Sequence, residues 1–331
     1  MEQKIYNEYV EILKEELLPA MGCTEPIAVA YAAAVAVQAL GEKPESVEVN
    51  VSANIIKNVK SVVVPCTGGL RGIGAAVCAG IVAGCPEKEL EILEEITGEQ
   101  KVEMKKMLDT MPMTIRESDK EYIFDIQIKA CAGGHSGYVE IAGFHTNVIC
   151  VKKDDEIIRE KAYEEQGSSC ATDRSLLTVE KIIEFADCVD VADVEEVLQR
   201  QIDYNWAIAE EGMTGKWGAA IGKTLMEAYG NSVHNRAKAM AAAGSDARMN
   251  GCELPVVINS GSGNQGMTTS LPVIVYAKEL NVSKEMMLRA LVVSNLITIH
   301  MKTGIGRLSA YCGAISAGCG AGAGICYLYG G

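Results

Sequence analysis

A glycine-rich run in the C-terminal half of the chain has the composition of an anion-binding loop. Residues 259–266 read Asn-Ser-Gly-Ser-Gly-Asn-Gln-Gly, and they lie between the apolar run 256–258 and a predicted helix that contains Pro272. Glycines at a helix N-terminus expose backbone N–H groups, and Ser, Asn and Gln side chains add neutral donors. A small carboxylate suits this glycine-rich loop as well as a phosphate does. The residues expected to bind it are Ser260, Gly261, Gly263, Asn264, Gln265 and Gly266.

Two other interpretations of the glycine-rich loop remain. Its glycines satisfy the G-x-G-x-x-G pattern of dinucleotide-binding loops, but the flanking chain lacks the βαβ pattern that such a loop requires. The second alternative is a tight turn between packed helices, with no ligand.

Cysteine is the second residue type with chemical potential, because the chain contains 12 cysteines in 331 residues. Cys312, Cys319 and Cys326 recur every seven residues. In one helix, successive members would lie ~10.5 Å apart along the axis. The three therefore cannot share one metal ion or one compact cluster, and at most one belongs to a given site. We expect at least two of them to be small residues that let helices approach closely.

Cys23 is the strongest single candidate for a ligand or a nucleophile. A helix is predicted over residues 24–40 with Thr24 as its N-cap, so Cys23 directly precedes a helix N-terminus. The helix dipole and the free N–H groups there stabilise a thiolate. A buried, inert thiol is the alternative.

A polar segment at residues 54–71 has the composition of a clamp for an anion or carboxylate, with solvated loop side chains as the alternative. Its candidate binding residues are Asn54, Asn58, Thr67 and Gly68, and it also contains Lys57. His145 is expected in a β segment, where it is either a general base or a hydrogen-bonded structural histidine.

The overall composition excludes several classes of protein. The net charge of -14 is spread along the chain, whereas binding to nucleic acid or to an anionic membrane needs clustered Lys and Arg. The cysteine content is too low for a disulfide scaffold, and the N-terminus lacks an apolar signal core. We therefore expect a cytoplasmic protein with reduced thiols. Residues 308–331 carry no charge, but they are rich in Gly, Ala, Ser and Cys, which predicts a packed helix rather than a membrane span.

The residue patterns predict an α+β fold, in which a large Gly/Ala-rich helical body accompanies a small antiparallel β-sheet. Alternating polar and apolar residues predict strands in the region 112–165, joined by one strand at about 46–54. Helical spacing predominates from residue 176 onward. The expected division is residues 1–111 with N-terminal helices and that strand, 112–165 as the β segment, and 166–331 as the helical catalytic body.

Four motifs occur in order along the chain. They are Met-Gly-Cys-Thr-Glu-Pro at 21–26, Asp-Ala-Arg-Met at 246–249, the glycine-rich loop, and Gly-Arg-Leu-Ser-Ala-Tyr-Cys-Gly at 306–313. Together they resemble the L-cysteine desulfidase family, relatives of the iron–sulfur L-serine dehydratase alpha chain, over essentially the whole chain. The resemblance implies an oxygen-sensitive lyase of anaerobic metabolism that degrades L-cysteine to hydrogen sulfide, ammonia and pyruvate. It also implies a 4Fe–4S cluster held by three cysteines, without pyridoxal phosphate.

The resemblance implies roles for individual residues. Cys23 and Cys312 match two of the cluster ligands of the family. The third ligand of the family lies in an Ile-Cys-Asp-Gly-Ala-Lys type segment further along, and this chain ends at Gly331 before reaching it. We therefore expect a truncated form whose cluster is weakly bound or absent. Substitution by Cys66, Cys252 or Cys319 is the alternative.

The mechanism implied by the resemblance is an α,β-elimination. The glycine-rich loop and residues 54–68 would orient the carboxylate and ammonium groups of an amino-acid substrate, and His145 or Lys57 would remove the α-proton. L-serine is the rival substrate for the same chemistry. Elimination by pyridoxal phosphate and non-catalytic carboxylate binding are the other rival functions. No nucleic-acid or membrane partner is expected, and a homo-oligomer is left open.

Overall fold

The computed structural model describes residues 1–163, 172–305 and 313–331 and divides the chain into two compact units. The helical unit comprises Met1–Gly22 with Cys170–Gly331, and the α/β unit comprises Cys23–Ser169. This division differs from the boundaries expected near residues 111 and 165. The first 22 residues group with the C-terminal half because their apolar side chains belong to its core.

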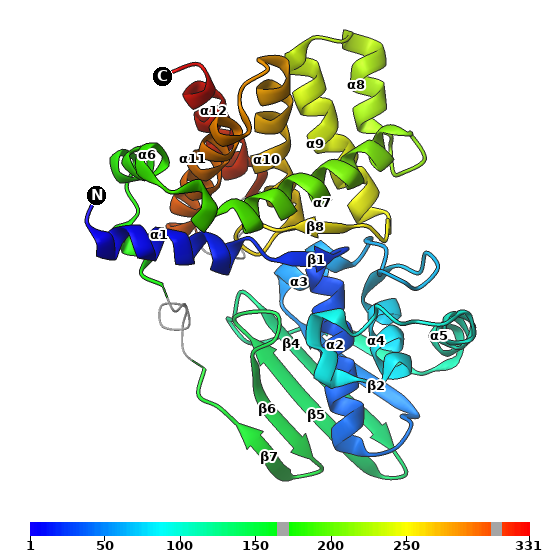
Figure 1. Cartoon of the computed structure of the whole chain (residues 1–331). Helices are drawn as coiled ribbons and strands as arrows, with labels where there is room; N and C mark the ends of the chain where they lie inside the picture. Colours follow the sequence, from blue (N-terminus) through cyan, green and yellow to red (C-terminus); the bar gives the residue numbers. More distant parts are fainter. Residues whose placement is uncertain (164–171, 306–312) are drawn as a thin grey trace. The chain divides into compact units, whose positions relative to one another are not determined.

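The helical unit is built from helices and one short two-stranded sheet (Figure 1). In that sheet, the first strand pairs antiparallel with the second, so that Ala20 lies opposite Val256. The described elements are α1 (Gln3–Glu16), β1 (Pro19–Met21), η2 (Arg174–Leu176), α6 (Val179–Cys188), η3 (Val191–Asp193), α7 (Glu195–Met213), α8 (Ile221–Tyr229), α9 (Val233–Met249), β8 (Pro255–Val257), α10 (Gly263–Glu279), α11 (Lys284–Thr303) and α12 (Gly313–Leu328).

An apolar core joins α1 to helices encoded more than 150 residues later. Tyr9 and Leu13 of α1 are completely buried together with Phe185 of α6 and Leu291 of α11. The rings of Tyr9 and Phe185 meet edge to face with centroids 5.3 Å apart, and the Tyr9 hydroxyl donates to the Leu176 carbonyl at 2.8 Å. An edge-to-face pair of this kind adds ~1 kcal/mol beyond the burial of its surface. The first helix is therefore an integral part of this unit.

Glycines rather than cysteines bring α12 close to α11. A Cβ atom on Gly320 would lie 2.1 Å from Thr298 Oγ1, and one on Gly324 would lie 2.7 Å from the Ala290 carbonyl oxygen. Cys319 and Cys326 are exposed. The expectation that these cysteines allow the close approach is therefore wrong, because the packed face of α12 is rotated away from them. Cys312 lies outside the described residues.

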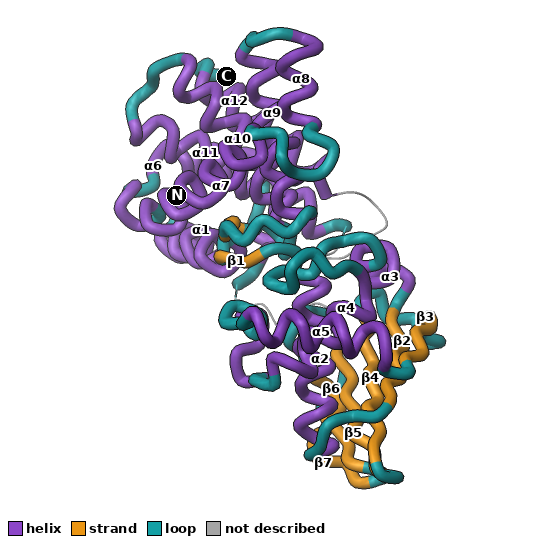
Figure 2. The backbone as a smooth tube through the Cα atoms, turned by 90° about the vertical axis from the view of Figure 1, so that its right-hand side faces the viewer, coloured by secondary structure: helices purple, strands orange, loops and turns teal. Residues whose placement is uncertain are grey.

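The α/β unit has a six-stranded sheet with helices packed on one face (Figure 2). The strand order is β3-β2-β4-β5-β6-β7. The elements are α2 (Thr24–Leu40), β2 (Ser46–Val51), α3 (Ala53–Val59), α4 (Gly72–Ala83), η1 (Pro86–Glu91), α5 (Gly98–Thr110), β3 (Met113–Glu117), β4 (Asp125–Ala132), β5 (His135–Ala142), β6 (Val148–Lys153) and β7 (Glu156–Glu160).

The α+β fold expected from the sequence is confirmed, with two differences in the sheet. Neighbouring strands are antiparallel except for β2 and β3, which run parallel with Val49 opposite Ile115, so the sheet is mixed. In addition, β2 ends at Val51 rather than near residue 54. Asn54 belongs to α3, because the chain turns into a helix at Ala53.

Close backbone contacts hold α2 in the α/β unit. A Cβ atom on Gly80 of α4 would lie 1.9 Å from the Ala30 carbonyl oxygen, and one on Gly137 of β5 would lie 2.1 Å from the Ala36 carbonyl oxygen. The alanine-rich sequence of α2 serves the same purpose, since small side chains let backbones approach. These contacts fix the helix whose N-cap is Cys23.

In the part of the chain that the structure describes, no helix combines the length and the apolar character needed to cross a bilayer. The uncharged C-terminal sequence forms α12, which packs on α10 and α11.

We predict that Gly80→Ala destabilises the protein by about 1–3 kcal/mol, because the added methyl group overlaps the backbone of α2. Gly98→Ala is the matched control, since a Cβ atom there has no neighbour within 4 Å. Urea unfolding of both variants measures the effect. Equal stabilities of the two variants would contradict the packing described for α2 and α4.

Candidate functional site

The glycine-rich loop forms a two-residue turn followed by the first turn of α10. The Asn259 N–H donates to the Ser262 carbonyl and the Ser262 N–H donates to the Asn259 carbonyl, both at 3.1 Å. Ser260 and Gly261 between them have φ values of 49° and 79°. Positive φ at both central residues is the geometry of a type I′ turn, which is costly for a serine unless the surroundings impose it.

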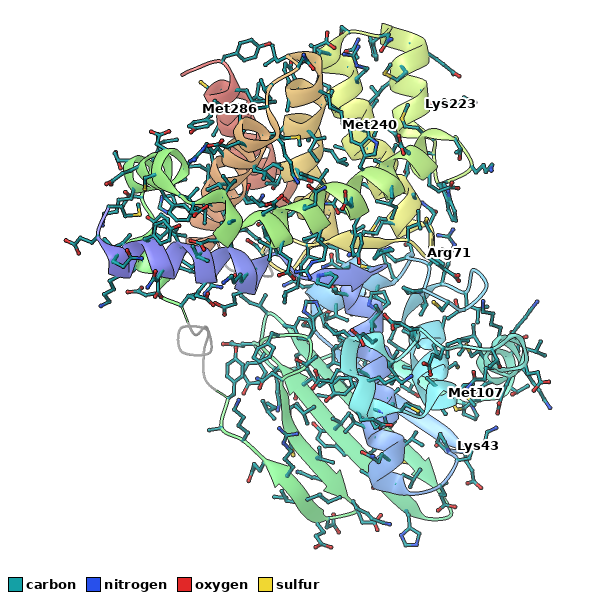
Figure 3. All side chains as sticks on the ribbon, in the orientation of Figure 1. Lys43, Arg71, Met107, Lys223, Met240 and Met286 are labelled. Carbon is teal, nitrogen blue, oxygen red and sulfur yellow. The ribbon has the colours of Figure 1, made fainter. Side chains whose placement is uncertain are left out.

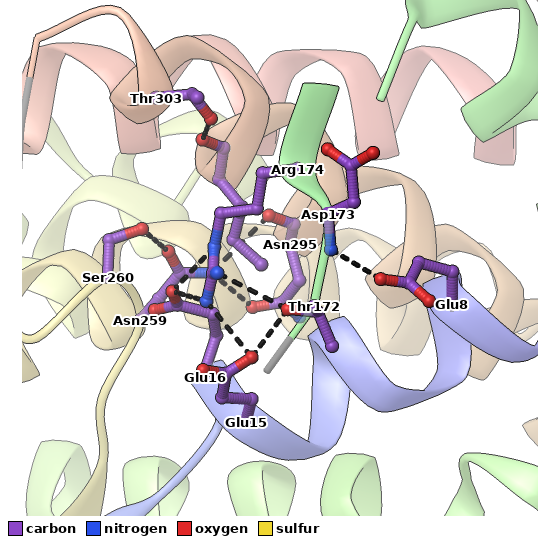
Figure 4. A network of polar contacts seen from close by, with 11 residues as sticks. Glu8, Glu15, Glu16, Thr172, Asp173, Arg174, Asn259, Ser260, Asn295 and Thr303 are labelled. Carbon is purple, nitrogen blue, oxygen red and sulfur yellow. Dashed lines mark hydrogen bonds and ion pairs between the residues drawn. The ribbon is translucent and has the colours of Figure 1, made fainter. Parts of the chain in front are cut away.

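A buried amide network imposes this turn. Asn259 Nδ2 donates to Asn295 Oδ1 of α11 at 2.9 Å, and Ser260 Oγ donates to Asn259 Oδ1 at 2.9 Å (Figure 4). Asn295 also exchanges two hydrogen bonds with Gln201 of α7, at 3.0 and 2.8 Å. All four side chains are buried. Because each amide satisfies another in a dry environment, the loop is held in one orientation.

A second buried set joins β8 to the start of α10. Asn205 Oδ1 accepts from the Val257 N–H at 2.8 Å, and its Nδ2 donates to Ser270 Oγ at 3.0 Å. Ser270 Oγ in turn donates to the Gly266 carbonyl at 2.8 Å. A Cβ atom on Gly266 would lie 2.0 Å from the Val257 carbonyl oxygen, so only glycine allows the helix to start here.

The first turn of α10 presents free backbone donors. Ser262 is the N-cap residue, and its hydroxyl makes no capping hydrogen bond. The first intrahelical backbone bond is donated by Gly266 to Ser262. The N–H groups of Gly263, Asn264 and Gln265 therefore have no acceptor within the helix, and the helix dipole places partial positive charge at this end.

Arg248 of α9 lies beside the same turn and was not singled out from the sequence. Its side chain is 2% exposed. Nε donates to the Gly22 carbonyl at 2.8 Å and Nη1 donates to Asn264 Oδ1 at 3.1 Å. A Cβ atom on Gly263 would lie 2.4 Å from Nε, so this glycine makes room for the guanidinium. The available signal was an arginine in an otherwise small-residue helical stretch.

Gln265 has a buried amide oxygen that no described residue satisfies. The side chain is 4% exposed, and Oε1 has no hydrogen-bond donor among the described residues. It lies against Gly313, where a Cβ atom would be 2.5 Å from this oxygen. A buried acceptor without a donor costs about 1–3 kcal/mol, which points to a ligand that donates to it. Gly313 directly follows Cys312 in the chain.

Cys23 is at the N-terminus of α2, in the α/β unit. It is itself the N-cap, and the expectation that Thr24 would be the N-cap is wrong. The Cys23 thiol is 4% exposed and donates to Glu25 Oε2 at 3.0 Å. Asn58 Nδ2 donates to the other oxygen of this carboxylate at 3.3 Å. The structure therefore brings two of the predicted residues, Cys23 and Asn58, onto one carboxylate.

The other residues predicted from the 54–71 segment have local contacts. The Thr67 hydroxyl donates to the Val64 carbonyl at 2.7 Å, and Asn54 Nδ2 donates to the Ile123 carbonyl at 3.4 Å. Gly68 has a φ of 74°, which favours glycine. Lys57 is exposed on α3.

His145 lies in the turn between β5 and β6 and not in a strand as expected. Its ring packs edge-on against Phe124, with centroids 4.9 Å apart. No printed contact of the described residues joins His145 to Cys23 or to the 54–68 residues. Its role as a base stays a prediction.

The described residues contain no group of three or more His, Cys, Asp or Glu side chains arranged to hold a metal ion. Cys312 lies outside them. Of the alternative third ligands, Cys252 is buried, which raises the pKa of its thiol, whereas Cys66 is half-buried and Cys319 is exposed.

Two hollows elsewhere contain none of the predicted residues. One of about 540 Å³ in the α/β unit is lined by Lys43 and Met107, and one of about 330 Å³ in the helical unit is lined by Trp206, Met213 and Met240 (Figure 3). Neither contains a buried polar atom without a partner. The glycine-rich loop therefore remains the better candidate for a ligand site.

Comparison with known proteins agrees with the motifs. The model of the serine dehydratase alpha chain family matches residues 87–331. A UPF0597 protein of Desulfitobacterium hafniense (strain Y51) is 57% identical over 330 residues, which cover 100% of this chain and 77% of the relative. UPF0597 proteins of Lachnoclostridium phytofermentans and Treponema denticola are 51% and 43% identical and are covered to 78% each, over 99% and 100% of this chain. No solved structure matches the chain. Since the family model covers most of the sequence, the chain belongs to the serine dehydratase alpha chain family.

Proposed function

We propose that this protein is a lyase that eliminates the β-substituent of a small L-amino acid, with L-cysteine as substrate. One observation carries the proposal. The first turn of α10 combines free N–H donors with the buried, unsatisfied Oε1 of Gln265. Donors for a carboxylate and an acceptor for an ammonium on one helical turn match the two charged groups of an α-amino acid. Membership of a serine dehydratase family supports the same substrate class.

The resemblance to L-cysteine desulfidases implies a 4Fe–4S cluster, and the donor chemistry of this chain fits it. Cys23 is a buried thiol at a helix N-terminus, where a thiolate is stabilised, and Glu25 accepts its proton in a hydrogen bond. We propose Cys23 and Cys312 as two of the ligands. When bound, the cluster supplies a Lewis-acid iron that polarises the leaving group on Cβ.

The residues of the chain bind and orient the substrate. The N–H groups of the first turn of α10, with Ser260 and Asn264, hold the carboxylate, and Gln265 Oε1 accepts from the ammonium. Asn58, Thr67 and Gly68 are proposed to complete the pocket. Fixing both ends of the substrate directs its Cα–H bond toward one base, so that proton removal needs no further reorganisation.

The elimination balances without any oxidant or reductant. His145 or Lys57 takes the α-proton, the C–H electron pair forms the Cα=Cβ double bond, and the Cβ–S bond breaks to release hydrosulfide. The aminoacrylate product tautomerises to an imine, which water hydrolyses to pyruvate and ammonia. L-serine is the second candidate substrate, with water as the leaving group, because the matching family is that of serine dehydratase.

We predict that protein reconstituted anaerobically with iron and sulfide releases sulfide and pyruvate from L-cysteine faster than it releases pyruvate from L-serine. Hydrosulfide is the better leaving group and suits iron. Parallel assays of both products at equal substrate concentration decide between the substrates. Absence of both products from iron-loaded protein would reject the lyase function.

We predict that Gln265→Met raises KM for the amino acid by about tenfold, because the ammonium loses its acceptor. The same change should leave the free energy of unfolding unchanged or slightly higher, since it removes a buried oxygen without a partner. Gln201→Met is the control. It leaves Asn295 without its amide partner and should lower the free energy of unfolding by about 1–3 kcal/mol. An unaltered KM for Gln265→Met would argue against this role.

We predict that loss of the base lowers kcat by about 100-fold or more with little change in KM, since a positioned base contributes in that range. Steady-state kinetics of His145→Gln and Lys57→Met test the two candidates. If both variants keep near-normal kcat, neither residue is the base.

A further inference from the structure

Arg248 carries a buried positive charge for which the structure describes no acidic partner. Its contacts among the described residues are neutral acceptors, namely the Gly22 carbonyl, Asn264 Oδ1 and Met249 Sδ. A guanidinium stays charged at physiological pH, and an uncompensated charge is costly in a protein interior. The side chain is nevertheless only 2% exposed.

Arg174 of the same unit shows how a half-hidden arginine is otherwise accommodated. Its side chain is 12% exposed and forms an ion pair with Glu16 at 2.5 Å (Figure 4). The acidic residue nearest to Arg248 in sequence, Asp246, accepts instead from the Ile221 N–H at 2.7 Å. Residues two apart on a helix do not face each other, so Asp246 does not compensate the guanidinium.

The Arg248 charge lies where the helix dipole is also positive. The space that a Cβ atom on Gly263 would need is within 2.4 Å of Nε and 2.8 Å of Cζ, so the guanidinium packs against the first residue of α10. Two sources of positive potential therefore meet at the free N–H groups of this turn. The Nη2 group of Arg248 has no acceptor among the described residues and provides two further donors.

The same turn contains an independent sign of a ligand, the unsatisfied Oε1 of Gln265. Arg248 contacts the first two residues of α10, and Gln265 is the third. A ligand that satisfies both needs an anionic group and an N–H donor close together. We propose that Arg248 binds the α-carboxylate of the substrate and is the counter-ion that the apo fold lacks. This inference rests on the proposed function for the choice of an α-amino acid as the ligand.

The test compares a carboxylate with its neutral analogue in the reconstituted protein. L-alanine has no leaving group, so it binds without turnover, and L-alaninamide keeps the ammonium but lacks the carboxylate. At pH 7, calorimetry should show that the wild type binds L-alanine about tenfold more tightly than L-alaninamide. Arg248→Met should abolish this preference by weakening L-alanine alone, and Arg248→Lys should restore part of it.

Arg236→Met is the matched control, because Arg236 lies on the same helix but is paired with Glu279 at the surface. It should leave the preference intact. Gly263→Ala, which displaces the guanidinium, is the second test if Arg248→Met does not fold. Iron content is measured for every variant.

The outcomes separate this inference from the lyase function. The absence of a preference in the wild type, an equal loss of both ligands in Arg248→Met, or a loss of iron with the preference retained would each overturn the inference. An Arg248-dependent preference in a protein that releases neither sulfide nor pyruvate would keep the inference and reject the lyase function. Turnover with an unchanged preference in Arg248→Met would do the reverse.

Discussion

Asn295 is the residue on which the arrangement around the glycine-rich loop depends. Its amide exchanges two hydrogen bonds with Gln201 of α7 and accepts one from Asn259 of the loop, while Asn295 itself belongs to α11. Two helices and the loop therefore meet at one buried side chain. Since an amide in a dry core must be fully paired, rotation or translation of any one element would leave the others unsatisfied. This closed network below the loop allows the groups above it to remain open toward a ligand.

Much of the fold follows from local sequence, and the exceptions have identifiable physical causes. The helix over residues 24–40 was predicted correctly because Glu-Pro in its first turn and the glycine at position 41 mark its two ends. The parallel pairing of β2 with β3 was missed, since strand order depends on contacts between segments 60 residues apart. The packed face of α12 was also missed. In a helix made mostly of Gly, Ala and Cys, hydropathy hardly differs from face to face, so the sequence contains no phase to read.

The candidate site was predictable where composition alone expresses its chemistry. Residues 259–266 were identified because glycines and small polar residues before a helix suit an anion, and the structure places them on one turn. Arg248 could not be found in this way, because its burial arises from a contact with Gly22, 226 residues away in the chain. The roles of His145, Lys57 and Cys312 stay predictions, since acid–base chemistry and ligation depend on distances that residue types do not encode.

The membership of α1 in the helical unit has a consequence for how the protein is made. Tyr9, Ile12, Leu13 and Leu17 emerge from the ribosome first, but their partners in α6 and α11 are synthesised last. The intervening α/β unit is contiguous in sequence and is complete once Ser169 has been added. It can therefore fold during translation, as domains generally do. Until α11 appears, the nascent chain carries an amphipathic helix with an uncovered apolar face, which makes the period of synthesis the time when this protein is most prone to aggregate.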